Sequence, residues 1–121
     1  MKTKECYSGS KKAIELLEMN DGSCEAQVFL DSLDKSDRRK IDVLFEMMGE
    51  QGKISNKEKF KKLEGTDGIF EFKSFQIRLL CFLHHSRVII CRGVRKKKEK
   101  HDRGDISYAE TCRRNFLGEN K

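Results

Sequence analysis

The stretch over residues 68–98 constrains the fold most, because it holds three short segments rich in β-branched and aromatic residues. The segments cover residues 69–73, 76–84 and 87–92, and only two residues separate each from the next. No helical pattern lies between them, so we expect them to pair as an antiparallel meander. The second and third contain near-continuous apolar runs, which are typical of strands covered on both faces.

A helical hairpin is predicted ahead of the meander. Residues 23–33 carry apolar side chains at helical spacing after a capping Ser23, and Asp34 or Ser36 can begin a second helix. The apolar positions of this second helix are spaced i, i+3, i+4 and i+7 and are Ile41, Leu44, Phe45 and Met48. This spacing indicates one buried helix face.

The remaining segments complete the predicted fold. Residues 11–19 fit a short helix or a strand, and we interpret them as a strand that covers one edge of the meander. Residues 106–117 fit a final helix. The predicted order is β-α-α-β-β-β-α, an α+β fold with a small antiparallel sheet, an N-terminal helical hairpin and a C-terminal helix. We expect residues 1–10 to be a flexible segment and residues 11–118 to form one domain.

The charge of the chain is unevenly distributed along the sequence. The formal net charge is +6, with 11 basic and 12 acidic residues in residues 1–60 against 15 and 8 in residues 61–121. The excess positive charge therefore lies in the half that contains the meander. A one-sided basic surface is expected of a nucleic-acid binder, although a lysine-rich surface also serves solubility alone.

The cysteines and the hydropathy pattern limit the compartment and the cofactors. Five cysteines occur without any CxxC spacing, which favours free thiols in a reducing cytoplasm over disulfides or a zinc site. No apolar run approaches the roughly 18 residues of a membrane span, and the first residues do not resemble a signal peptide. We expect a cytoplasmic protein with no metal, no cofactor and no membrane partner.

Four short strings carry a family resemblance. The chain contains, in order, FLDSL at residues 29–33, KLEG at 62–65, QIR at 76–78 and GVRKK at 93–97. In this order and spacing they resemble the RelE/HigB superfamily of toxins, in its phage-derived HigB-like branch, over roughly residues 12–117. The resemblance implies a RelE/ParE-like fold and a toxin of a type II toxin–antitoxin pair.

The activity that the resemblance implies is metal-independent cleavage of mRNA on the ribosome, which inhibits translation. In this chemistry the ribose 2′-OH attacks the adjacent phosphate, and the reaction needs a base, an acid and cations that stabilise the developing charge. The implied partners are mRNA on the ribosome, with contacts to rRNA, and a cognate antitoxin, usually of the helix-turn-helix type.

Candidate catalytic residues follow from the resemblance. Lys73 matches a strand lysine that acts as base, and Arg78 matches a strand arginine that stabilises the phosphate. Arg95 or Lys96 matches the arginine after the last strand, a candidate acid or stabiliser. Glu71 stands where many relatives have a second lysine.

Candidate nucleic-acid contacts come from the basic segments and one aromatic residue. The lysines expected to grip the RNA backbone are Lys61, Lys62, Lys97 and Lys98. Tyr108 lies near the position of a base-stacking tyrosine in the family. The basic tract has an alternative role as an electrostatic tether without catalytic function.

Alternatives remain open at both the residue and the protein level. Arg78 can be a structural arginine paired with Glu71 across strands, and Lys73 can be a solvated strand-end lysine. His84, His85 and His101 are weaker acid–base candidates. At the protein level, a ParE-like toxin would inhibit DNA gyrase without catalysis, and an inactive phage-derived remnant is a third possibility.

Overall fold

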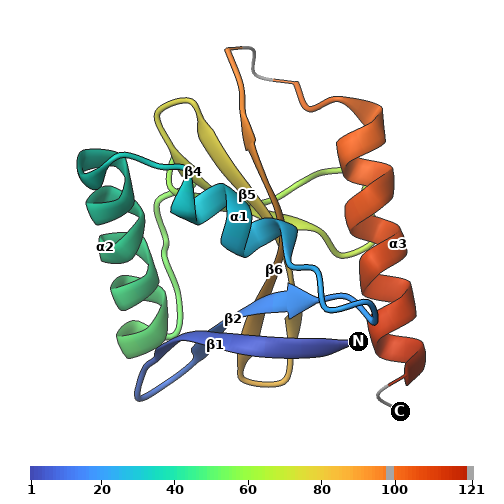
Figure 1. The fold of residues 1–121 in the computed structure, drawn as a ribbon. Coiled ribbons are helices and arrows are strands. Elements are labelled where there is room, and N and C mark those ends of the chain that lie inside the picture. Colours follow the sequence, from blue (N-terminus) through green and yellow to red (C-terminus); the bar gives the residue numbers. More distant parts are fainter. Residues whose placement is uncertain (98–99, 120–121) are drawn as a thin grey trace.

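The computed structural model describes residues 1–97 and 100–119 of the 121-residue chain. Within this part, a six-stranded sheet has the strand order β1-β2-β6-β5-β4-β3 (Figure 1). The strands are β1 (Lys2–Ser8), β2 (Ala13–Glu18), β3 (Phe60–Lys62), β4 (Phe70–Ser74), β5 (Ile77–His84) and β6 (Arg87–Arg95). The helices are α1 (Glu25–Asp31), α2 (Lys35–Gln51) and α3 (Arg103–Glu119). Figure 1 shows α2 and α3 on opposite sides of the sheet.

The predicted meander is present, as β4, β5 and β6 pair antiparallel in sequence order. The predicted sheet is nevertheless wrong in two respects. Six strands are described where four were predicted, and one pair of strands is parallel where all were predicted to be antiparallel. β2 pairs with β6 in parallel, with Ala13 opposite Arg87 and Leu16 opposite Ile90, so the sheet is mixed. This parallel pairing is possible because the long connection from β2 to β6 carries the chain back to the same end of the sheet.

The predicted N-terminal helical hairpin is also wrong, because two strands precede the helices. We expected residues 1–10 to be flexible, but Lys2–Ser8 forms β1 and pairs antiparallel with β2 at the edge of the sheet. The Tyr7 hydroxyl donates a hydrogen bond to Glu50 Oε2 of α2 at 2.5 Å. The terminal amino group contacts Glu119 Oε1 of α3 at 3.1 Å. These two contacts attach the polar N-terminal segment to α2 on one side of the sheet and to α3 on the other.

Helix α2 follows its sequence signals closely. Asp34 is the N-cap, and its side chain accepts a hydrogen bond from the Asp37 N–H at 2.8 Å. The helix ends at Gly52, whose φ of 78° is a left-handed conformation that glycine adopts without strain. All four residues of its predicted apolar stripe are buried, which confirms that face. Helix α1 differs from expectation, because Cys24 and not Ser23 occupies its N-cap.

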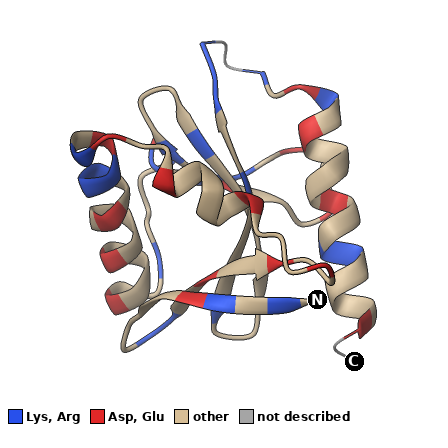
Figure 2. Ribbon diagram, viewed as in Figure 1, with Lys and Arg blue, Asp and Glu red and all other residues tan. Residues whose placement is uncertain are grey.

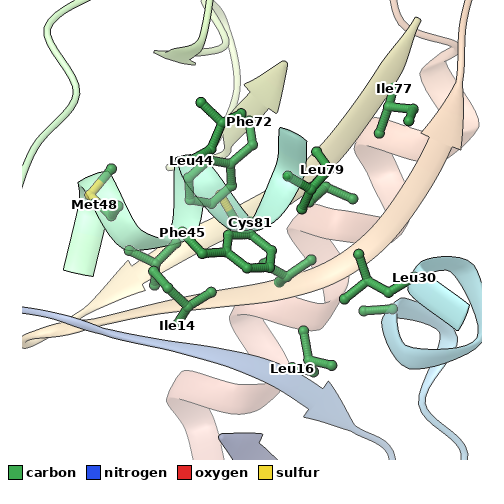
Figure 3. Packing of buried hydrophobic residues seen from close by; sticks show 14 of the residues in the cluster. Ile14, Leu16, Leu30, Leu44, Phe45, Met48, Phe72, Ile77, Leu79 and Cys81 are labelled. Carbon is green, nitrogen blue, oxygen red and sulfur yellow. The ribbon is translucent and has the colours of Figure 1, made fainter. Parts of the chain in front are cut away.

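The core on the α1 and α2 side of the sheet is apolar throughout (Figure 3). Phe45 of α2 meets Phe72 of β4 edge to face, with ring centroids 5.4 Å apart. Alternate residues of β5, namely Ile77, Leu79 and Cys81, point into this core. Full burial of each large side chain contributes about 1.5–3 kcal/mol to folding, so this side is the main source of stability.

The core on the α3 side is divided into an apolar part and a charged part. Leu80 and Phe82 of β5 pack beneath α3, and the rings of Phe82 and Phe116 lie 5.5 Å apart. Farther along the same face lie Glu71 and Arg78, the two charged residues that are buried among those described. The buried charges therefore occur on one side of the sheet alone.

In the described part of the chain, no helix combines the length and the apolar character that a membrane crossing requires.

Candidate functional site

Strand pairing brings two predicted catalytic residues together. Lys73 of β4 lies directly opposite Arg78 of β5 in the antiparallel ladder. Directly opposed residues point to the same face, and Leu80, two residues after Arg78, belongs to the core under α3. Lys73 and Arg78 therefore share the α3 face at the end of the sheet formed by the β4–β5 turn.

Arg78 is buried and fully engaged by neighbouring groups. The residue is 5% exposed, and its Nε lies 3.2 Å from Glu71 Oε1. Its Nη1 donates to the Ile77 carbonyl at 3.1 Å and also to the Phe75 carbonyl. A guanidinium held this way is well placed to fix the β4–β5 turn and to neutralise a buried carboxylate.

Glu71 connects Arg78 to a histidine that sequence reasoning treated as a weak candidate. Glu71 is 2% exposed, and its Oε1 also lies 3.3 Å from His101 Nε2. The His101 side chain is 4% exposed, and its Nδ1 is buried without a hydrogen-bond partner in the part of the chain that the structure describes. Buried polar atoms are rarely left unpaired, so an orphaned imidazole nitrogen is a candidate functional group.

Arg78, Glu71 and His101 form a buried triad. The chemistry open to His101 depends on which ring nitrogen carries the proton. When His101 Nε2 carries the proton and donates to Glu71, Nδ1 is an acceptor and can serve as a base. When the ring is protonated, Nδ1–H is a donor and can serve as an acid. Arg78 and Glu71 orient the ring, as a carboxylate does in other base–orienter pairs.

Lys73 contacts a carboxylate at the surface of the molecule. Its Nζ lies 3.2 Å from Glu58 Oε2, and Glu58 is itself an exposed residue. The Lys73 backbone N–H donates to the Lys59 carbonyl at 2.8 Å. The Glu58 carboxylate is exposed to solvent, so this contact can be exchanged for a contact with another anion such as a phosphate.

Arg95 lies apart from this group. It pairs in register with Ile77, whose side chain is in the core beneath α2, so Arg95 projects toward the α2 side. Its Nη1 lies 3.9 Å from Asp37 Oδ2 near the start of α2, and half of its side chain is exposed.

The rest of the basic tract begins directly after β6. The Lys96 backbone N–H donates to the Gln76 carbonyl at 2.7 Å, which ties the tract to the β4–β5 turn. The Lys96 Nζ donates to the Lys100 carbonyl. Lys97 is exposed. Lys98 lies outside the described residues.

Lys61 and Lys62 lie on the edge strand β3. They line a groove of ≈ 900 Å³ together with Lys57 and the two stacked rings of Phe60 and Phe70, whose centroids are 5.4 Å apart. Lys61 pairs in register with Glu71, whereas the rings of Phe60 and Phe70 pack against the core on the α2 side. Both lysines therefore lie on the strand next to β4, the strand that carries Lys73.

Tyr108 makes its contacts within a different cluster. Its ring lies 3.8 Å from the Arg92 guanidinium carbon, a cation–π geometry. Burial and a hydrogen bond to Glu25 raise the pKa of its phenol well above the usual value. Arg92 in turn contacts Glu25 at 3.0 Å and Asp105 at 3.3 Å. Tyr108 of α3 thus packs toward β6 and α1 in this structure.

Positive charge gathers around the β4–β5 turn, and further lysines and arginines lie along β1 and on α3 (Figure 2). Figure 2 shows lysine and arginine along the β4–β5 hairpin, at the end of β6 and on the first turns of α2. The described residues contain no group of three or more His, Cys, Asp or Glu side chains that could hold a metal ion. The chemistry available around this turn is that of cations, one carboxylate–histidine pair and an exposed aromatic ring.

These features define a small basic protein in which helices cover both faces of a mixed sheet and a group of cations lies around the β4–β5 turn. The chain belongs to the family described as phage derived protein Gp49-like (DUF891), whose model matches residues 28–114. A comparison with curated proteins finds no match. The matched residues run from α1 into α3 and include all the predicted site residues. The phage-derived part of the resemblance is thereby confirmed, and the finer RelE/HigB assignment stays a prediction.

Proposed function

We propose that this protein is the toxin of a type II toxin–antitoxin pair and that it inhibits translation by cleaving mRNA on the ribosome. Membership of the phage-derived Gp49-like family is compatible with a toxin. The observation that carries the proposal is the meeting of Lys73, Arg78, Glu71 and His101 at one end of the α3 face. The proposed setting is the cytoplasm, with ribosome-bound mRNA as substrate and a helix-turn-helix antitoxin as partner.

The buried contacts of Arg78 favour roles that differ in part from those implied by the resemblance. We assign Arg78 the task of positioning Glu71 and the β4–β5 turn, because its guanidinium is occupied by three acceptors. Lys73 is the cation that meets the scissile phosphate, and His101 transfers the proton. His101 Nδ1 lies below the surface, so this role requires the residues above it to shift when RNA binds.

The proposed reaction needs no cofactor. A base removes the proton of the ribose 2′-OH, and the oxygen forms a bond to the adjacent phosphorus. The bond from phosphorus to the 5′-oxygen breaks, and an acid supplies the proton that this oxygen takes up. The products are a 2′,3′-cyclic phosphate and a 5′-hydroxyl. Lys73 and Lys96 stabilise the extra negative charge that develops on the phosphate oxygens.

The test is primer extension on a reporter mRNA in a purified translation system. Wild-type protein is compared with Lys73→Met, His101→Gln and a matched control, Lys2→Met, which removes one exposed positive charge from β1. We expect discrete cuts at ribosome-positioned codons, lost in the first two variants and retained in the control. Cuts that persist in Lys73→Met and His101→Gln would overturn the assignment of roles.

An intact mRNA with translation still running would overturn the ribonuclease proposal. The same protein would then be assayed for inhibition of gyrase supercoiling. Inhibition there would indicate a ParE-like toxin, and inactivity in both assays would favour a phage-derived remnant.

A further inference from the structure

The turn between β4 and β5 presents an aromatic ring to solvent. Ser74 pairs with Ile77, so the turn consists of Phe75 and Gln76 alone. Phe75 is 76% exposed, the most of any large hydrophobic side chain in residues 1–97 and 100–119. Its backbone φ is 54°, in the left-handed region that L-residues with a Cβ rarely adopt.

Neither folding nor turn chemistry accounts for phenylalanine at this position. Two-residue turns that need a positive φ favour glycine, asparagine or aspartate, which adopt it at lower cost. A phenylalanine there carries backbone strain and also leaves apolar surface in water. Strain of this kind persists where the surrounding structure enforces it, and it occurs preferentially at functional sites.

The surrounding structure does enforce this conformation. The buried Arg78 donates from Nη1 to the carbonyls of Phe75 and Ile77, and Glu71 holds the same guanidinium from the other side. The Lys96 N–H donates to the Gln76 carbonyl on the outer side of the turn. The ring is therefore presented by a preorganised turn, which lowers the entropic cost of binding a ligand.

Cations surround the exposed ring. A groove of ≈ 350 Å³ beside it is lined by Lys40, Lys59 and Lys73 and by Val43 and Leu44 of α2. Lys40 Nζ lies 4.4 Å from the centroid of the Phe75 ring. The one carboxylate in the groove belongs to Glu58, which contacts Lys73. The groove thus combines a flat apolar surface with an excess of positive charge.

We propose that Phe75 is a stacking platform for one unpaired nucleobase of single-stranded RNA, with the flanking phosphates held by Lys40, Lys59 and Lys73. Every base has a π face that can stack on an aromatic ring, and the lysines select a polyanion. A base within a duplex cannot reach the ring, so the ligand is single-stranded. The inference deepens the proposed function, because it names how that site holds its substrate next to Lys73.

The sequence contains no tryptophan, so a single introduced tryptophan is the sole source of tryptophan fluorescence. Phe75→Trp places a single tryptophan at the proposed platform, and Val28→Trp places one at a control position on α1 that is 70% exposed. The ligand is a single-stranded 2′-O-methyl RNA oligonucleotide, which lacks the 2′-OH and cannot be cleaved by the proposed reaction. We expect saturable quenching of the Phe75→Trp fluorescence by RNA and little change for Val28→Trp.

Further probes separate stacking from charge and from a protein ligand. An abasic oligonucleotide of equal charge should quench Phe75→Trp far less than the base-bearing one. Equal quenching of the two tryptophan variants, or equal quenching by the abasic strand, would overturn the proposal. So would a polyglutamate peptide that quenches Phe75→Trp when RNA does not, since it would indicate an acidic protein ligand.

A second variant measures the size of the effect in the natural site. Phe75→Gly removes the ring from an exposed position and should bind the 2′-O-methyl RNA at least tenfold more weakly than wild type. Its thermal midpoint should not fall. RNA binding is measured here without ribosomes and without cleavage. If RNA stacks on position 75 but the protein does not cleave mRNA, only the proposed ribonuclease activity is contradicted. Cleavage by wild type with unchanged RNA affinity in Phe75→Gly would contradict only the platform.

Discussion

The two faces of the sheet are buried by different means. The buried side chains of the face under α1 and α2 are apolar, with Phe45 and Phe72 at its centre. The face under α3 is apolar near Phe82 but ends in Glu71, Arg78 and His101. Burying an ion pair is seldom the most stable solution, because desolvation offsets the Coulomb attraction. The comparison teaches that the first face is built for stability, whereas the charged end of the second is less favourable for stability and is the part that the proposed function uses.

The largest expected effects come from single truncations on each face. Arg78→Ala leaves the Glu71 carboxylate buried without its main partner and should lower the free energy of unfolding by about 3–5 kcal/mol. Phe45→Ala should cost about 3–5 kcal/mol through lost burial and a cavity. Chemical denaturation measures both values. An Arg78→Ala protein as stable as wild type would show that the charged part of the α3 face is not desolvated, and the comparison would fail.

The two variants should differ in function per folded molecule. Phe45→Ala protein that remains folded at low temperature should retain RNA cleavage, whereas folded Arg78→Ala protein should lose it. Cleavage is measured at a temperature where circular dichroism shows both proteins to be folded. Equal loss in the two variants would mean that both faces act through stability alone.

A change at Lys73, at the end of the charged face, should affect cleavage more than stability. The Lys73 side chain is 14% exposed, and its partner Glu58 is solvated, so Lys73→Met should lower the free energy of unfolding by about 1–2 kcal/mol, less than Arg78→Ala. Cleavage should fall by about 10²-fold or more if Lys73 meets the phosphate. Denaturation and primer extension on the same preparation check the two values. A large loss of stability with intact cleavage would place Lys73 among the structural residues.

The smallest expected effect concerns the two hairpin turns of the meander. Phe75 and His85 both have a positive φ, at 54° and 57°, but the His85 ring packs 4.2 Å from His84 while Phe75 is exposed. Phe75→Gly should therefore raise the free energy of unfolding by about 1 kcal/mol, and His85→Gly by less, because it also loses a ring contact. Thermal melts compare the pair. A destabilised Phe75→Gly protein would show that the ring contributes to folding.

The sequence predicted the regular, strongly patterned parts of the fold. The three meander segments correspond to β4, β5 and β6, and the stripe containing Ile41 and Phe45 is buried as expected. β1 was missed because Lys2–Ser8 is polar and mostly exposed, so it lacks the alternation that marks a half-buried strand. β3 was missed because its three residues are too few to form a pattern. The parallel pairing of β2 with β6 depends on long-range topology and not on either strand's composition.

Some contacts of the site could be predicted from the sequence and others could not, because local patterns do not reveal long-range contacts. Lys73 and Arg78 are five residues apart in one hairpin, so their pairing follows from local register. His101 is 30 residues from Glu71 in sequence, and no local pattern indicates that contact. Phe75 was assigned to a break between strands, although an aromatic residue in a two-residue turn is an unusual choice that the sequence displays.

The most direct test of a face arranged for function is the double variant Glu71→Leu/Arg78→Met. It replaces the buried ion pair with apolar side chains of similar size, so the free energy of unfolding should lie within about 2 kcal/mol of wild type and should exceed that of Arg78→Ala. Growth arrest on expression should be lost, because neither the turn nor His101 is then positioned. A folded double variant that still arrests growth, or one as unstable as Arg78→Ala, would contradict the functional role of this face.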